Sequence, residues 1–191
     1  SLIQFPLSIR FCIIQLNMKN SCDHSNCTHA NTSVSQTLSE MHWERGLWYA
    51  AFYGDEERVI SLIAKSGKGI VNLPDNAGYT PLHYAARKGY VDICKILLKN
   101  GALIDAKTKS GLATPLHKAA AAGKIEAIKF LINSGACVEM QDADGQTVLH
   151  KAAENKHRDL VNFLMESYPK LMSLKDTKGH CGTDYMSSPR D

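Results

Sequence analysis

The tetrapeptide Thr80-Pro81-Leu82-His83 decides the fold of this chain, because two close copies of it follow at a nearly constant interval. The copies are Thr114-Pro115-Leu116-His117 and Thr147-Val148-Leu149-His150, which begin 34 and then 33 positions further along. An interval of this size is typical of stacked structural repeats. Because a catalytic group is needed only once, a residue that returns in every unit indicates a structural role that each unit requires.

The repeated unit is longer than the tetrapeptide. In the first copy a turn containing Gly78 precedes the threonine, Ala85-Ala86 follows the histidine, and the apolar residues 93–98 complete the unit. With their counterparts in the other copies, these features resemble the ankyrin repeat. The resemblance implies an all-α solenoid of helix-turn-helix units with projecting β-turn fingers. It also implies that the histidine of each unit bonds the threonine and neighbouring backbone groups.

The residue types explain why each unit folds in this way. Thr80 is expected to cap a short helix with Pro81 at its first position, where the missing N–H costs nothing. A unit of this length cannot bury its apolar face alone, so neighbouring units must stack. We expect the interface between units to include Leu97, Leu131 and Leu164.

Incomplete copies flank the three units. Residues 47–63 match the helical part, with Trp48 in place of the histidine, and residues 176–184 match the opening part. Terminal repeats are atypical because each caps an exposed core. We therefore expect the array to span residues 41–186 and residues 187–191 to be a disordered end.

The second and third complete units depart from the pattern. Ala113 adds one residue before Thr114, so this finger should bulge, and Thr108 replaces the aspartate that opens the other fingers. Lys156 stands where a glycine should end the first helix, and residues 167–169 should take the last connection off its usual path. These two units are expected to be less regular than the first.

The segment 1–40 is expected to be a disordered polar tail, because residues 19–40 are rich in Asn, Ser, Thr and His and carry almost no aliphatic side chains. Residues 1–17 are apolar but interrupted, and too short to span a membrane. They lack the features of a secretory signal. Whether they belong to the mature protein or precede a natural start at Met18 is left open.

The six cysteines do not indicate a disulfide framework, so we expect reduced thiols in a cytoplasmic protein, with the nucleus as an alternative location. One cluster in the tail has the residue types of a zinc site. It consists of Cys22, His24, Cys27 and His29. Because these four are local and have no hydrophobic support, we favour a solvated tail with no metal and no cofactor. A zinc-binding regulatory protein is kept as the alternative function.

Charge and motifs argue against several function classes. The net charge is +3, and basic and acidic residues are interleaved, which does not favour nucleic acid. The sequence carries neither a hydrolase signature nor a Gly-rich phosphate-binding loop. We expect no enzyme activity, and instead a monomeric adaptor or scaffold that binds a protein partner.

The family resemblance places partner binding on the concave face, at the finger tips and at the exposed side of each first helix. The expected residues are Phe52, Tyr53, Asn76, Tyr79, Arg87, Lys88, Lys109, Leu112, Asp144, Gln146, Glu154 and Asn155. Because aromatic and arginine side chains dominate interface energetics, the main patch is expected at Phe52, Tyr53, Tyr79, Arg87 and Lys88. An equal alternative is that Phe52 or Tyr53 only covers the edge of the opening unit.

Overall fold

The computed structural model describes residues 46–187, and all structural statements below concern this part of the chain. The elements are α3 Leu47–Tyr53, α4 Glu56–Ser66, η2 Lys68–Asn72, α5 Pro81–Lys88, α6 Val91–Lys99, α7 Pro115–Ala121, α8 Ile125–Asn133, α9 Val148–Glu154, α10 Arg158–Ser167, η3 Pro169–Ser173 and α11 Asp184–Ser187. Within residues 46–187 the β-type pairing is one isolated bridge, between Lys175 and Cys181. The expected all-α class is confirmed.

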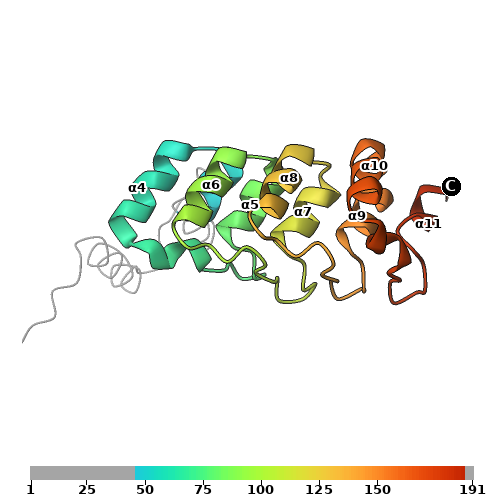
Figure 1. Cartoon of the computed structure of the whole chain (residues 1–191). Coiled ribbons are helices and arrows are strands. Elements are labelled where there is room, and N and C mark those ends of the chain that lie inside the picture. Colours follow the sequence, from blue (N-terminus) through green and yellow to red (C-terminus); the bar gives the residue numbers. More distant parts are fainter. Residues whose placement is uncertain (1–45, 188–191) are drawn as a thin grey trace, which may run out of the picture. The chain divides into compact units, whose positions relative to one another are not determined.

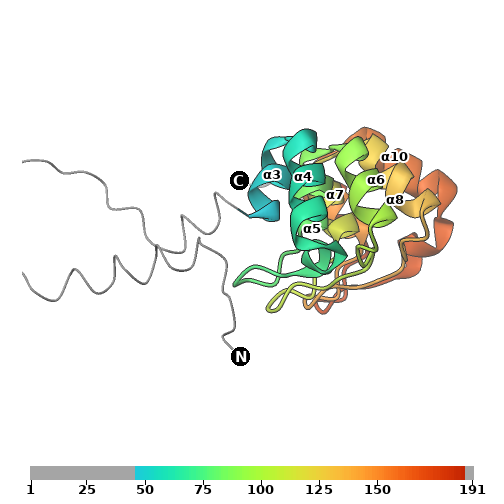
Figure 2. The same cartoon turned by 90° about the vertical axis from the view of Figure 1, so that its left-hand side faces the viewer.

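The helices form pairs that repeat along the array. The first helices α3, α5, α7, α9 and α11 contact one another in sequence order, while the second helices α4, α6, α8 and α10 stand in a row beside them (Figure 1). The connecting fingers all project to the same side of the helices, as the end view also shows (Figure 2). We number the fingers by residues: the first is 75–79, the second 108–113, the third 142–146 and the fourth 176–180. The expected helix-turn-helix solenoid is confirmed.

The core lies between successive helix pairs and is continuous along the array. Leu97 of α6, Leu131 of α8 and Leu164 of α10 are fully buried in it, as expected for residues at the interface between units. The paired alanines of the first helices, such as Ala85 and Ala86, are fully buried too, because a small side chain lets neighbouring helices approach closely. No unit buries this surface alone, so the units stabilise one another.

Each complete first helix begins at a threonine that is tied to the histidine three positions later. At α5 the hydroxyl of Thr80 accepts the backbone N–H of His83, and the N–H of Thr80 donates to His83 Nδ1 over 3.0 Å. Pro81 occupies the first helical position. The same arrangement joins Thr114 to His117 and Thr147 to His150. The recurring histidine therefore fixes the start of each of these helices.

The other ring nitrogen of each histidine reaches the next repeat. His83 Nε2 lies 3.0 Å from the carbonyl oxygen of Ala113. Equivalent bonds join His117 to Gln146 and His150 to His180. Because a carbonyl oxygen can only accept, Nε2 carries the proton and Nδ1 is the acceptor. In the opening unit Trp48 takes this place, and its indole N–H donates to the carbonyl of Leu73 over 2.8 Å.

Three of the four fingers are β-turns held by an aspartate. Asp75 Oδ1 accepts the backbone N–H groups of Ala77 and Tyr79 over 2.9 and 2.8 Å. Asp142 and Asp176 hold the third and fourth fingers in the same way. Backbone hydrogen bonds also join each finger to the next, so the fingers form one connected edge.

The second finger bulges as expected. Its closing hydrogen bond runs from the N–H of Thr108 to the carbonyl of Ala113, one residue longer than in the other fingers, and Leu112 takes the left-handed region with φ 47°. The hydroxyl of Thr108 accepts the N–H of Ala113 over 3.0 Å. Lys156 takes the left-handed position after α9 with φ 60°, where a glycine was expected in the pattern. After α10 the chain turns through η3, which is the expected departure of the last connection.

Candidate functional site

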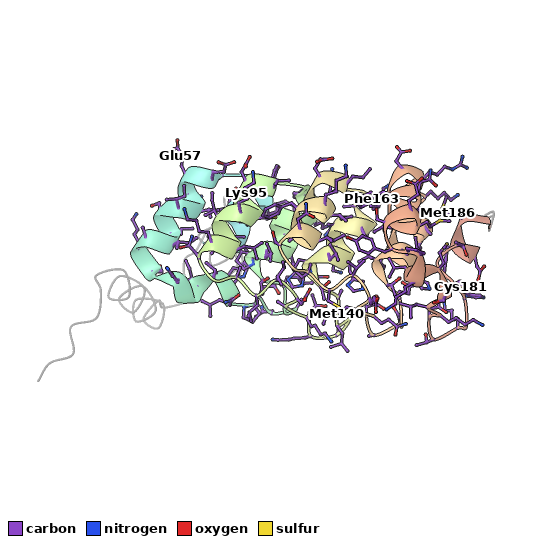
Figure 3. All side chains as sticks on the ribbon, in the orientation of Figure 1. Glu57, Lys95, Met140, Phe163, Cys181 and Met186 are labelled. Atoms are coloured by element: carbon purple, nitrogen blue, oxygen red, sulfur yellow. The ribbon has the colours of Figure 1, made fainter. Side chains whose placement is uncertain are left out.

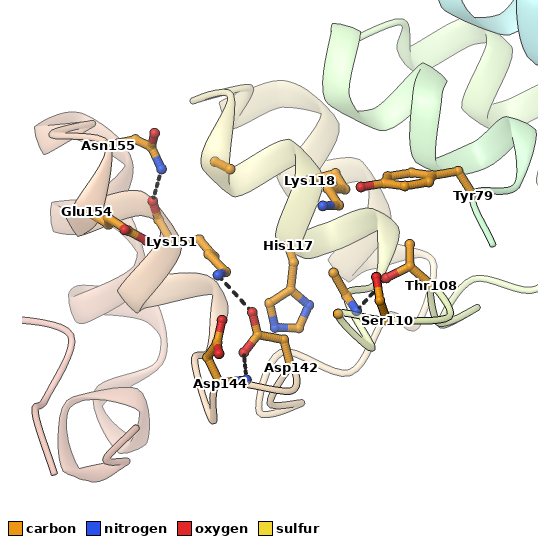
Figure 4. A pocket seen from close by; sticks show the side chains of 13 residues that line it. Tyr79, Thr108, Ser110, His117, Lys118, Asp142, Asp144, Lys151, Glu154 and Asn155 are labelled. Carbon is orange, nitrogen blue, oxygen red and sulfur yellow. Dashed lines mark hydrogen bonds and ion pairs between the residues drawn. The ribbon is translucent and has the colours of Figure 1, made fainter. Parts of the chain in front are cut away.

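A groove of about 460 Å³ lies between the second and third fingers and the first helices α7 and α9 (Figure 4). Its polar lining comes from both repeats and includes Thr108, Ser110, Asp142 and Asp144 of the fingers and Lys118, Lys151, Glu154 and Asn155 of the helices. The ring of Tyr79, from the first finger, closes one end. The groove is therefore built by neighbouring repeats together, and no single repeat contains it.

The aspartate that opens a finger also bonds a side chain of the following first helix. Asp75 Oδ2 accepts the hydroxyl of Tyr84 over 2.5 Å, and Asp176 Oδ2 accepts the hydroxyl of Tyr185 over the same distance. In both cases the donor follows the aspartate by nine positions. Burial and the hydrogen bond to Asp75 raise the pKa of Tyr84 above its ordinary value, so this hydroxyl remains a donor. The finger is thus anchored to its own helix through one carboxylate.

In the third unit the same position forms an ion pair inside the groove. Asp142 Oδ2 lies 2.8 Å from Lys151 Nζ, with side-chain exposures of 4% and 20% respectively. Burial alone would raise the pKa of Asp142, but hydrogen bonds from Lys151 and from the backbone of Gln146 outweigh it, and the pKa lies below its ordinary value. The pair is drawn in Figure 4. Its charges are already matched within the protein.

The second unit lacks this pair, because Thr108 stands where the other fingers have aspartate. Lys118 of α7 is the counterpart of Tyr84 and Lys151, since each follows the histidine that caps its helix. The hydroxyl of Thr108 is used by the backbone of its own finger. Lys118 forms no ion pair with any residue of the described range. Its ammonium group instead lies 4.9 Å from the centre of the Tyr79 ring (Figure 4).

A second surface feature is a cluster of aromatic rings at the opening unit. Tyr53 is 59% exposed and stacks against Tyr49 with ring centres 4.3 Å apart. Phe52 is half-buried: its ring contacts that of Tyr84 edge to face at 6.0 Å, and Lys88 Nζ lies 4.1 Å above it. The two aromatic residues therefore differ, since Phe52 joins two repeats and Tyr53 faces solvent.

The expected binding residues other than Gln146 fall into three places. Tyr79, Asp144, Glu154 and Asn155 line the groove. Asn76, Lys109 and Leu112 are exposed on the first and second fingers, where Lys109 Nζ donates to the carbonyl of Asn76 over 3.1 Å. The remaining group, which does not line the groove, consists of Phe52, Tyr53, Arg87 and Lys88 at the opening and first complete units.

Gln146 differs from the expectation, because its side chain is buried rather than presented to a partner. Its Oε1 accepts Lys151 Nζ over 2.5 Å, and its Nε2 lies 3.4 Å from the hydroxyl of Tyr185. Its backbone carbonyl accepts a hydrogen bond from Nε2 of His117. All of its polar groups are therefore engaged inside the array, and we exclude Gln146 from the binding surface.

The groove also contains polar residues that were not among those expected, including Thr108, Lys118, Asp142 and Lys151. The sequence contains a signal for these residues. In the first and third units, the residue after the capping histidine is preceded by an aspartate nine positions earlier. The position is filled by Asp75 and by Asp142, whereas the second unit has Thr108 and an inserted residue. Only the structure shows that the two residues bond each other, because the finger folds back against its first helix.

Other expectations concern residues outside the described range. The candidate zinc ligands Cys22, His24, Cys27 and His29 lie there, as does the whole of the expected tail, 1–40. Between residues 46 and 187, no group of three or more His, Cys, Asp and Glu side chains is placed to hold a metal ion. The helices of this same region are all too short or too polar to cross a bilayer.

The repeats can now be assigned to a family. The family model described as "Ankyrin repeats (3 copies)" matches residues 14–108 and 103–175, which together are most of the chain. The chain belongs to the ankyrin-repeat family. The expected family is thereby confirmed, and the helix pairs with their fingers are its ankyrin repeats.

Several relatives share these ankyrin repeats. The chain is 49% identical to ankyrin repeat domain-containing protein 39 of Homo sapiens over 84 residues, which are 43% of this chain and 45% of that protein. It is 31% identical to SMC5-SMC6 complex localization factor protein 1 of Bos taurus over 169 residues, which are 88% of this chain and 13% of that protein. The chain therefore spans less than half the length of these two relatives.

Proposed function

We propose that this chain is a non-enzymatic adaptor or scaffold that holds a protein partner against its fingers and first helices. Ankyrin repeats generally mediate protein–protein interaction. The observation that carries the proposal is the groove, because its polar lining comes from two repeats and lies beside the projecting fingers (Figure 4). A partner segment in this groove meets side chains of both repeats at once.

The state of the groove histidine supports binding rather than catalysis. Both ring nitrogens of His117 are bonded, Nδ1 to Thr114 and Nε2 to the carbonyl of Gln146 over 3.0 Å. Burial lowers the pKa of His117, so the ring stays neutral near pH 7. A general acid or base needs a nitrogen that can exchange its proton with a substrate. We therefore assign His117 to holding the groove together.

The proposed contact surface has the groove at its centre and the finger tips beside it. In the groove it comprises Tyr79, Asp144, Glu154 and Asn155. At the finger tips it adds Asn76, Lys109 and Leu112. A second area at the opening end comprises Phe52, Tyr53, Arg87 and Lys88. Polar, charged and aromatic side chains occur together on this surface, as they do at interfaces between proteins.

Blocking the groove tests the proposal. Ser110 is exposed and lines the groove, so Ser110→Trp should fill it without removing a core side chain. The matched control is Ser61→Trp, an exposed serine on α4; this helix also carries Glu57, which points away from the fingers (Figure 3). Tagged forms of the 191-residue chain are used for affinity capture from cell lysate, with mass spectrometry of the bound proteins.

The two variants should behave differently. We expect proteins captured by the parent chain to be retained by Ser61→Trp and lost by Ser110→Trp, while thermal unfolding of both variants stays close to that of the parent. Equal capture by all three chains would place the partner elsewhere and refute the proposed groove.

We further propose that the protein meets its partner in the cytoplasm or the nucleus. Among the described residues Cys94, Cys137 and Cys181 are all free thiols. Burial raises the pKa of Cys94 to about 12, so this thiol stays protonated and behaves as a small apolar side chain. Free thiols persist in reducing compartments. Imaging of a fluorescently tagged chain checks the location, and exclusive retention in secretory vesicles contradicts it.

A further inference from the structure

We propose that the groove recognises an Asp or Glu side chain of an extended partner segment, and that Lys118 is the group that binds its carboxylate. This inference rests on the proposed function, since it names the chemistry that the partner must present. It goes beyond it by assigning one position of the partner. The other units of the array serve as internal references for this position.

The repeat has a defined place for a carboxylate between each finger and its first helix. In the first and fourth fingers Asp75 and Asp176 fill it and bond a tyrosine hydroxyl. In the third finger Asp142 fills it and bonds the ammonium of Lys151 over 2.8 Å. In the second finger Thr108 brings no carboxylate. The same structural position is therefore acidic three times and neutral once.

Although the second unit lacks the aspartate, its first helix still carries a lysine, Lys118. Lys118 occupies the place that Lys151 occupies in the next repeat, and both line the groove. Lys151 is paired with Asp142, whereas Lys118 pairs with no carboxylate of residues 46–187. Its ammonium is held near the Tyr79 ring, 4.9 Å from the centre. A cation–π contact attracts the ammonium without using its three donors as a carboxylate would.

The groove gives a carboxylate two further reasons to bind at this end. Ser110, on the same finger as Thr108, adds a hydroxyl to the lining. The opposite end carries Asp144, which repels a carboxylate and favours a basic or neutral residue there (Figure 4). The charges thus change sign along the groove, from Lys118 to Asp144. This sets both the position of the acidic residue and the direction of the partner segment.

The most specific test restores the carboxylate that the second finger lacks. Thr108→Asp places a carboxylate where the third finger has Asp142, within the protein's own framework. We expect it to pair with Lys118 and so to occupy the ammonium internally. The fold should tolerate this change, because an aspartate at the same position holds the other three fingers. Partner binding should be weakened although no binding residue has been removed.

Short peptides are the probe for this test. A library of random peptides is selected on the full chain, and the affinity of one selected peptide is measured by calorimetry. The variants are Thr108→Asp and Lys118→Met, with Lys95→Met as the matched control, because Lys95 is an exposed lysine on α6. A Glu→Gln or Asp→Asn version of the peptide removes only the charge.

Selected peptides should share an acidic residue at one fixed position. Neutralising it should weaken binding to the parent chain about three- to tenfold, the range for a partly exposed charge pair. Lys118→Met and Thr108→Asp should each cause a similar loss, and the neutral peptide should lose nothing further on these variants. Binding to Lys95→Met should match the parent, and the melting temperature of Thr108→Asp should not fall.

The contrary outcomes separate the two proposals. Peptides that lack a shared acidic residue, or that bind all variants equally, but are lost on Ser110→Trp overturn the role of Lys118 and leave the groove as the partner site. Peptides that also bind Ser110→Trp unchanged overturn both proposals, whereas a failure to select any peptide overturns only the role of Lys118 in binding an extended acidic segment.

Discussion

The imidazole of His83 and the carbonyl of Ala113 are joined over 3.0 Å although they belong to different repeats and lie thirty positions apart. The other ring nitrogen ties His83 to Thr80 at the start of its own helix. One side chain therefore fixes the helix start within a repeat and the spacing to the next repeat. Because this occurs three times, the histidines hold the fingers at the positions that create the groove.

Removal of the central histidine should be strongly destabilising. In His117→Ala the buried N–H of Thr114 loses its acceptor, and the carbonyl of Gln146 keeps only its bond from the N–H of Asp142. An unsatisfied buried polar group costs about 1–3 kcal/mol, so we expect the free energy of unfolding to fall by about 2–4 kcal/mol. Urea unfolding measures this value. His180→Ala is the control, because the His180 side chain is exposed, and it should cost less than about 1 kcal/mol. Similar small losses for both would contradict the role of His117.

Stability should fall in mildly acidic solution. Burial lowers the pKa of His83 to about 4 and lowers that of His117 as well, while an unfolded histidine titrates near its ordinary value of 6.5. Between pH 6.5 and 4 the unfolded chain therefore binds more protons than the folded chain, so the free energy of unfolding decreases as the pH falls. Stability is full above pH 6.5, and His83 alone should account for a loss of about 3 kcal/mol across the window.

Urea unfolding at several pH values tests this dependence. His83→Gln keeps a polar side chain that does not titrate, so its stability should vary less between pH 6.5 and 4 than that of the parent. The lowered pKa of Asp142 acts in a separate range, because its contribution is lost only as the pH falls below the ordinary carboxyl value of 3.8. A parent chain whose stability is constant down to pH 4 would show that the histidines titrate normally.

The opening unit should separate packing from recognition. Phe52→Ala removes a half-buried ring that bridges to Tyr84, so we expect the free energy of unfolding to fall by about 2 kcal/mol. Tyr53→Ala removes a mostly exposed ring and should change stability by less than about 1 kcal/mol while reducing capture of the partner. Thermal unfolding and affinity capture of both variants decide the matter. If neither variant loses the partner, the aromatic cluster only covers the end of the array.

The fold was largely predictable from the sequence, because its information is local and repeated. A threonine, a proline and a histidine at fixed spacing define each helix start, and the inserted Ala113 already indicated the bulge that Leu112 completes. Because the pattern occurs three times, each copy confirms the structural role inferred from the others. The departure at Lys156 could be placed for the same reason, since the other units show what normally stands there.

The site was less predictable, because it depends on contacts between positions that the pattern treats separately. Gln146 follows a turn glycine, as exposed finger residues do. Its side chain is nevertheless buried, with hydrogen bonds to Lys151 and Tyr185. Thr108 was recognised as a substitution, but its consequence for Lys118 follows only when the finger lies against α7. The period predicts which residues are equivalent, and three-dimensional packing decides which of them remain available to a partner.

The close approach of neighbouring fingers makes Gly78 a sensitive position. Its φ is +90°, and a Cβ there would lie 2.5 Å from the backbone nitrogen of Lys109, which donates to the carbonyl of Ala77. Gly101 is a matched control, because its φ is +88° and a Cβ there would meet no atom of a more distant residue within 4 Å. Gly101→Ala therefore measures the cost of the left-handed backbone alone, about 1 kcal/mol.

Gly78→Ala carries that backbone cost and, in addition, must push two fingers apart. We expect a total loss of about 3 kcal/mol in urea unfolding, since backbone atoms cannot move aside as the end of a flexible side chain does. The same displacement should disturb the groove, because Tyr79 follows Gly78 directly and Thr108 precedes Lys109. Partner capture should therefore fall for Gly78→Ala and persist for Gly101→Ala. Equal losses of stability for the two variants would mean that the fingers are not in contact as described.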